Sequence, residues 1–138
     1  MDSVYKETKL NYKKGTNFTM KDKLQKITER YFLSFENKDI GALKKIFDKD
    51  VKLFDPIVKE VIGRDKVLEV NKNIFNTCKL INFTQKNIFI DSEKMVTIGE
   101  IEFYCDKVKL NVVDIIKFNS KFKIISITAY LDTEVLND

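Results

Sequence analysis

The spacing of apolar side chains changes from a helical to a strand period near residue 80, and this change constrains the fold more than any other feature. Before it, apolar residues recur every three or four positions, which is typical of amphipathic helices. After it, they alternate with polar residues, which is typical of strands with one buried face. The order predicts an α+β domain in which three helices pack on one face of an antiparallel sheet.

Three segments carry the helical period. The first spans 21–36, the second follows the candidate N-cap Asp39, and the third follows Gly63. Their apolar faces are formed by Leu24, Ile27, Tyr31 and Phe35, then by Ile40, Leu43, Ile46 and Phe47, and then by Val67, Leu68, Asn71, Ile74, Phe75 and Cys78. A short strand over 51–54 ends at Asp55-Pro56, because a residue before proline is held extended. The later strands are predicted at 81–90, 95–104, 108–118 and 123–131.

The length of 138 residues suits a single domain with its own core. We expect residues 1–19 to form a polar, disordered extension and residues 20–138 to form the domain. The net charge of +4 is spread among acidic residues, which disfavours nucleic-acid binding. No segment resembles a membrane span or a signal sequence. With two isolated cysteines, Cys78 and Cys105, these features predict a cytoplasmic protein.

Composition also limits the chemistry that the chain can perform. It contains no histidine, which excludes histidine-based nucleophile systems and histidine-ligated metals. Two distant cysteines form neither a CxxC redox pair nor a zinc site, and no glycine-rich phosphate loop is present. We therefore expect no metal and no cofactor, and chemistry carried by carboxylates, tyrosines, amides or lysines.

Asp114 breaks the apolar row of its predicted strand. Alternate residues of 108–118 are Leu110, Val112, Asp114, Ile116 and Phe118, so the carboxyl group points toward the core. A lone buried carboxylate costs several kcal/mol, and no lysine or arginine shares the row. We expect a neutral Asp114 that donates a hydrogen bond. The alternative is a structural carboxylate satisfied by a hydroxyl group or a buried water.

Three further polar residues interrupt apolar patterns. Tyr31 lies on an apolar helix face, where a tyrosine is ordinarily a core residue whose hydroxyl group finds a partner. Asp55 precedes a proline at a strand end, where an aspartate often serves only the turn. Asn71 places an amide on a buried helix face and needs a partner, for which Tyr31 is a candidate.

These residues occur in a familiar arrangement. Tyr31, Phe54-Asp55-Pro56, Gly63-Arg64, the segment 111–118 and Ala129-Tyr130 together resemble bacterial ketosteroid isomerase and, more broadly, the nuclear transport factor 2-like (SnoaL-like) superfamily. The resemblance covers nearly everything from residue 21 to residue 132. It implies a cystatin-like cone, in which a curved antiparallel sheet wraps the helices and encloses a deep apolar pocket.

The resemblance assigns roles to three of these residues. It implies that Asp55 is a general base and that Tyr31 and a protonated Asp114 form an oxyanion hole. The supporting tyrosines of those isomerases are replaced by Phe47 and Asn71. Leu131 replaces a tryptophan of the pocket wall, and Thr97, Gly99 and Ile101 are expected to face the ligand and alter the pocket's shape.

The predicted substrate is a small, mostly apolar molecule with one carbonyl group. Its binding residues are predicted to be Phe35, Phe54, Val70, Asn71, Ile101, Leu110, Val112, Ala129 and Leu131. The opposite sheet face carries Val113, Ile115, Ser126, Thr128 and Tyr130. This face is too apolar to lie open to water, so we expect a homodimer formed through it. Such dimers are common in the superfamily.

The resemblance leaves the activity open between several classes. The favoured hypothesis is a cofactor-independent isomerase that moves a proton beside a ketone. The alternatives are a non-catalytic small-molecule-binding domain and an enzyme similar to polyketide cyclases or dehydratases. An epoxide hydrolase is less favoured, because the sequence shows no convincing Asp-Arg-Asp set.

Overall fold

The structure is a computed structural model that describes residues 19–133, and its helices begin where the sequence supplies capping groups. Helix α2 (Met20–Glu36) starts with a capping box, in which the Thr19 hydroxyl accepts from the Asp22 amide and the Asp22 carboxylate accepts from the Thr19 amide, each at 3.1 Å. Asp39 caps helix α3 (Ile40–Ile46) through the Ala42 amide at 3.0 Å, as predicted. Helix α4 (Arg64–Thr77) follows Gly63, also as predicted. Of the extension expected over residues 1–19, residues 1–18 lie outside the described residues, and Thr19 is the N-cap of α2.

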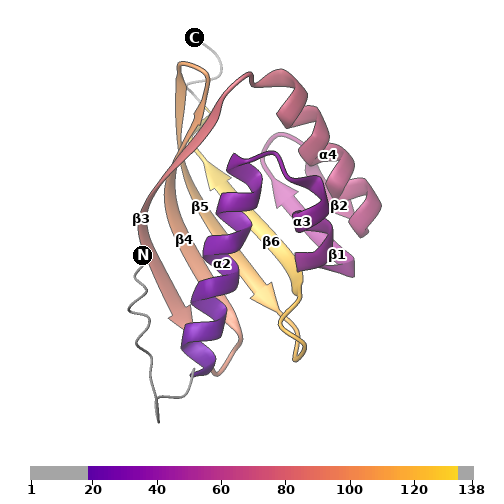
Figure 1. Cartoon of the computed structure of the whole chain (residues 1–138), viewed down its shortest axis with the longest axis vertical. Coiled ribbons are helices and arrows are strands. Elements are labelled where there is room, and N and C mark those ends of the chain that lie inside the picture. The colour runs from indigo at the N-terminus through magenta and orange to yellow at the C-terminus, as the bar shows by residue number, and fades with distance from the viewer. Residues whose placement is uncertain (1–18, 134–138) are drawn as a thin grey trace.

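Six strands form one sheet in the order β2-β1-β6-β5-β4-β3. The strands are β1 (Phe47–Asp55), β2 (Lys59–Ile62), β3 (Ile81–Asp91), β4 (Val96–Cys105), β5 (Val108–Phe118) and β6 (Ile124–Leu131). The last four fall within one residue of their predicted bounds. Figure 1 shows α2, α3 and α4 on the same face of this curved, open sheet, with α2 crossing it and α3 and α4 beside β1 and β2. The predicted α+β class and helix placement are therefore confirmed.

Three details differ from the sequence prediction. The sheet is mixed, because β1 runs parallel to β6 while every other pair is antiparallel. Strand β1 begins at Phe47, directly after α3, rather than at residue 51. Strand β2 was not predicted, since three of its four residues are exposed and it pairs only with β1, so it carries no apolar face.

The prediction of two isolated cysteines is also wrong. Cys78 at the end of α4 and Cys105 at the end of β4 form a disulfide bond, with Cα atoms 5.2 Å apart. The bond ties the helix to the sheet across 27 residues of chain. Paired cysteines remove the basis on which a reducing compartment was inferred.

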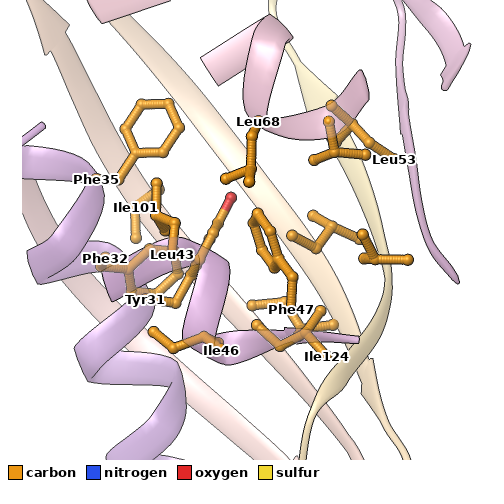
Figure 2. Packing of buried hydrophobic residues seen from close by; sticks show 14 of the residues in the cluster. Tyr31, Phe32, Phe35, Leu43, Ile46, Phe47, Leu53, Leu68, Ile101 and Ile124 are labelled. Carbon is orange, nitrogen blue, oxygen red and sulfur yellow. The ribbon is translucent and has the colours of Figure 1, made fainter. Parts of the chain in front are cut away.

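The core lies between the sheet and the helices α2, α3 and α4, each of which contributes buried side chains (Figure 2). Phe32 is fully buried against Gly99 of β4, where a β-carbon would come within 2.6 Å of the ring. One turn earlier, the hydroxyl groups of Thr28 and Thr97 hydrogen-bond at 2.8 Å, and Thr28 also donates to the Leu24 carbonyl at 2.8 Å. These contacts fix the height of α2 above the sheet. On the α4 side, the helices and the sheet do not close completely, and a cavity remains.

Candidate functional site

The cavity has a volume of about 470 Å³ and lies between α2, α4 and the concave face of the sheet. It contains the three residues predicted to carry chemistry and all but one of those predicted to bind a ligand. They are Tyr31, Phe35, Asp55, Val70, Asn71, Ile101, Leu110, Val112, Asp114, Ala129 and Leu131. Residues separated by as many as 100 positions thus meet in one pocket, as the predicted cone requires.

Phe54 is the exception, and its assignment to the pocket wall is wrong. Its side chain is 39% exposed and points to the outer face of β1, beside Lys52 in the alternation. The inward positions are Val51, Leu53 and Asp55, so Leu53 lines the cavity in its place. Leu53 and Phe54 are both apolar, and only the alternation of side chains along the strand places them on opposite faces of the sheet.

Two of the three β4 residues expected to face the ligand do not border the cavity. Thr97 and Gly99 lie under α2, where they contact Thr28 and Phe32. Of the three, only Ile101, two residues beyond Gly99 on β4, lines the cavity. The helix covers the first part of the strand and leaves the last part open.

Asp114 points into the core, as the strand period predicts, and is 6% exposed. Its register partners are Gly99 on β4 and Ala129 on β6, two small residues that leave space beside the carboxyl group. Burial, with a smaller contribution from the negative charge of Asp55, raises its pKa from 3.8 to about 7. Among the described residues, no hydroxyl group or cation satisfies this carboxyl group, which favours its neutral, donating form.

Tyr31 projects from α2 toward Phe47 and Leu68, as Figure 2 shows, and is 7% exposed. Its ring centroid lies 6.0 Å from that of Phe47. Burial raises its pKa well above 10, and the charges of Asp114 and Asp55 add to that rise. The phenol is therefore a neutral donor, and its hydroxyl group makes no hydrogen bond to any residue of 19–133.

Asp55 ends β1 at the rim of the cavity. One carboxylate oxygen, Oδ1, accepts from the Ile57 and Val58 amides at 2.7 Å and 2.8 Å. Asp55 therefore both stabilises the turn and lines the cavity. The turn holds the carboxylate in one orientation and places the exposed apolar side chains of Ile57 and Val58 at the cavity mouth.

Asn71 occupies the inner face of α4 and is 4% exposed. Its amide nitrogen Nδ2 is buried and has no hydrogen-bond partner among the described residues. The partnership with Tyr31 considered from the sequence is therefore not formed.

Sequence reasoning missed several other wall residues. Phe83 and Phe103 face each other on β3 and β4, and both line the cavity together with the disulfide bond. The period of their strands marks both phenylalanines as inward-facing, whereas nothing local marks the cysteines as partners. Within residues 19–133, no three acidic or cysteine side chains gather where a metal ion could bind. None of the helices there is both long and apolar enough to span a membrane.

Comparison with known proteins agrees with this geometry. The family model of the SnoaL-like domain matches residues 28–127. The chain belongs to the SnoaL-like domain family. A search of curated proteins gave no match.

Solved structures share the fold at low sequence identity. A steroid delta-isomerase from Pseudomonas aeruginosa has a TM-score of 0.69 at 12% identity, over 88% of this chain and 90% of that one. An LEH-like epoxide hydrolase from M. tuberculosis has a TM-score of 0.71 at 10% identity, over 86% and 90%. A protein with a cystatin-like fold from Silicibacter pomeroyi has a TM-score of 0.67 at 17% identity, over 81% and 80%. At these identities the likeness establishes the SnoaL-like, cystatin-like fold, whose neighbours include isomerases and hydrolases.

Proposed function

We propose that this SnoaL-like domain is a cofactor-independent isomerase that moves a proton beside a ketone. The observation that carries the proposal is the grouping of a turn-held carboxylate, a buried phenol and a buried acid with a raised pKa in one largely apolar cavity. Tyr31, Asp55 and Asp114 all line this cavity, so that one substrate could contact the three groups together.

In the proposed reaction, the Asp55 carboxylate removes a proton from the carbon beside the ketone. The electrons of that C–H bond form the carbon–carbon double bond of an enolate, and the negative charge moves to the ketone oxygen. Tyr31 and neutral Asp114 donate hydrogen bonds to this oxygen. Asp55 then returns the proton to another carbon, so that the substrate is isomerised and the enzyme regenerated.

The two hydrogen-bond donors and the general base would each contribute substantially to the rate. By analogy with other oxyanion holes, each donor aimed at the developing charge contributes on the order of 3–4 kcal/mol in a dry cavity. A positioned general base contributes roughly 10²–10⁴-fold. Neither Arg30 nor Arg64 lines the cavity, which disfavours an Asp-Arg-Asp hydrolase centre.

A homodimer is part of the proposal. Val113 and Ile115 on β5 lie opposite Tyr130 and Thr128 on β6, on the sheet face away from the helices. Tyr130 is 55% exposed, so a second copy would cover an apolar surface that the helices do not reach. Light scattering on the purified protein would give the mass of a dimer, and Tyr130→Lys would shift it toward the monomer.

The test begins with planar phenols, which mimic the enolate. Wild-type protein should bind them, and Tyr31→Phe and Asp114→Ala should each weaken binding about tenfold or more, because each removes a donor to a charged oxygen. Tyr104→Phe, outside the cavity, is the matched control. Folded protein that binds no phenol, or equal binding by all four proteins, would contradict the oxyanion hole.

Turnover then separates the enzyme from a binding domain. With β,γ-unsaturated ketones as substrates, Asp55→Asn should abolish proton transfer and leave phenol binding in place. Unchanged turnover in Asp55→Asn would show that Asp55 is not the base. Phenol binding without turnover of any ketone would favour the non-catalytic alternative.

A further inference from the structure

Among the described residues, Asn71 is the buried polar residue of the cavity that has no role in the proposed reaction. Its side chain is 96% buried, and Nδ2 has no partner among the described residues. Of the other α4 residues that line the cavity, Val70 and Ile74 are apolar, and the polar Asn73 and Thr77 are exposed and do not pair with Nδ2. An unpaired amide donor in such surroundings is unfavourable for the empty protein.

The amide also lies near the place assigned to the ketone oxygen. Tyr31 points toward Leu68 on α4 (Figure 2), and Asn71 follows Leu68 by three residues on the same buried face. Three residues of helix advance about 4.5 Å along the axis. A group bound to Asn71 would thus lie about one helical turn from the Tyr31 end of the cavity.

We propose that Asn71 determines substrate specificity by donating a hydrogen bond to a second oxygen of the substrate. This inference rests on the proposed function and narrows its substrate class. The substrate is then a ketone with a hydroxyl, ether or second carbonyl oxygen close to the reacting carbonyl, as in a β-hydroxy ketone or a 1,3-dicarbonyl compound. A hydrocarbon with a single ketone would leave the amide unpaired in a cavity that it empties of water.

Matched phenols test this without knowledge of the substrate. Methoxyphenols and ethylphenols have nearly the same size and differ by an ether oxygen in place of a methylene group. Wild-type protein should bind 2- or 3-methoxyphenol about tenfold more tightly than the corresponding ethylphenol, although the ethyl compound is more apolar. The two 4-substituted compounds, whose substituent points away from the hydroxyl group, should show no such preference.

Asn71→Leu keeps the branching of the side chain and removes its donor. It should abolish or reverse the preference for methoxyphenol and leave ethylphenol binding unchanged or stronger. The control Asn76→Leu changes an exposed asparagine of α4 outside the cavity and should keep the preference. Without ligand, Asn71→Leu should unfold at the same or a higher temperature than the wild type, because an unpaired buried donor is lost.

The outcomes distinguish this inference from the proposed function. Equal binding of methoxy- and ethylphenols that still depends on Tyr31 and Asp114 would overturn the role of Asn71 alone. Asn71→Leu that weakens both compounds equally, or that lowers the unfolding temperature, would assign the amide to a bound water or to the fold and also overturn it. Absence of any phenol binding would overturn both.

Discussion

Replacing Asp114 by asparagine should make the protein more stable above neutral pH. The amide has the shape of the neutral acid and can donate a hydrogen bond, but it cannot ionise. In the wild type, the same position must either hold a proton or carry a buried charge among small and apolar neighbours. The comparison therefore isolates the free energy of ionising one buried group.

The sign and size follow from the pKa of Asp114, which rises from 3.8 to about 7 on folding. Below about pH 4 the group is protonated in both folded and unfolded chains and costs nothing. Between pH 4 and pH 7 the unfolded chain ionises while the folded one does not, so stability falls as the pH rises. At about 1.4 kcal/mol per pH unit, the loss reaches about 4 kcal/mol and stays constant at higher pH.

Urea unfolding from pH 5 to pH 8 measures this difference. The free energy of unfolding of Asp114→Asn, relative to wild type, should increase from pH 5 to pH 8. At pH 8 it should exceed the wild-type value by about 3–4 kcal/mol. Asp50→Asn, which changes an exposed carboxylate of β1, should show a difference that hardly varies with pH. The reasoning is refuted if the wild type is the more stable protein at pH 8, or if the difference between Asp114→Asn and wild type stays constant across the series.

Two further predictions concern the fold. The double substitution Cys78→Ala with Cys105→Ala should lower the free energy of unfolding, measured with urea, by about 3–4 kcal/mol, because it releases a loop of 27 residues in the unfolded chain. Reducing agent should cause the same loss in wild-type protein and none in the double variant. Gly99→Ala should lower the unfolding temperature and destabilise the fold by about 1–3 kcal/mol, because the new methyl group would overlap the buried Phe32 ring. The control Gly41→Ala in α3 meets no close contact and should not destabilise the protein. Equal effects of the two substitutions would contradict this packing argument.

The sequence predicts the centre of the site better than its edge. Asp114 could be placed because the alternate positions around it, from Leu110 to Phe118, are all apolar, so its orientation follows from the strand period. Phe54 was misplaced because two adjacent apolar residues, Leu53 and Phe54, compete for one inward position. Strand β2 escaped prediction because an exposed edge strand needs no apolar pattern.

Contacts between distant segments could not be predicted in the same way. Cys78 and Cys105 come together only once α4 has docked on the sheet, and no pattern in either segment refers to the other. Likewise, the sequence shows that Asn71 needs a partner but not that the folded chain provides none. Both features are properties of the packed molecule.

The unpaired groups of the cavity share one physical explanation. Tyr31, Asn71 and Asp114 are buried, and the described part of the chain gives none of their polar groups a hydrogen bond, an arrangement that lowers stability. Gly99 and Ala129 keep space open beside Asp114, where larger side chains could have filled it. A bound oxyanion would restore part of this stability by accepting a hydrogen bond from Asp114. Asp114 can donate that bond only while it is protonated, so binding favours its protonated form. Binding of a phenolate should therefore extend the wild-type protein's stability to higher pH, and the same ligand should give Asp114→Asn no such pH-dependent gain.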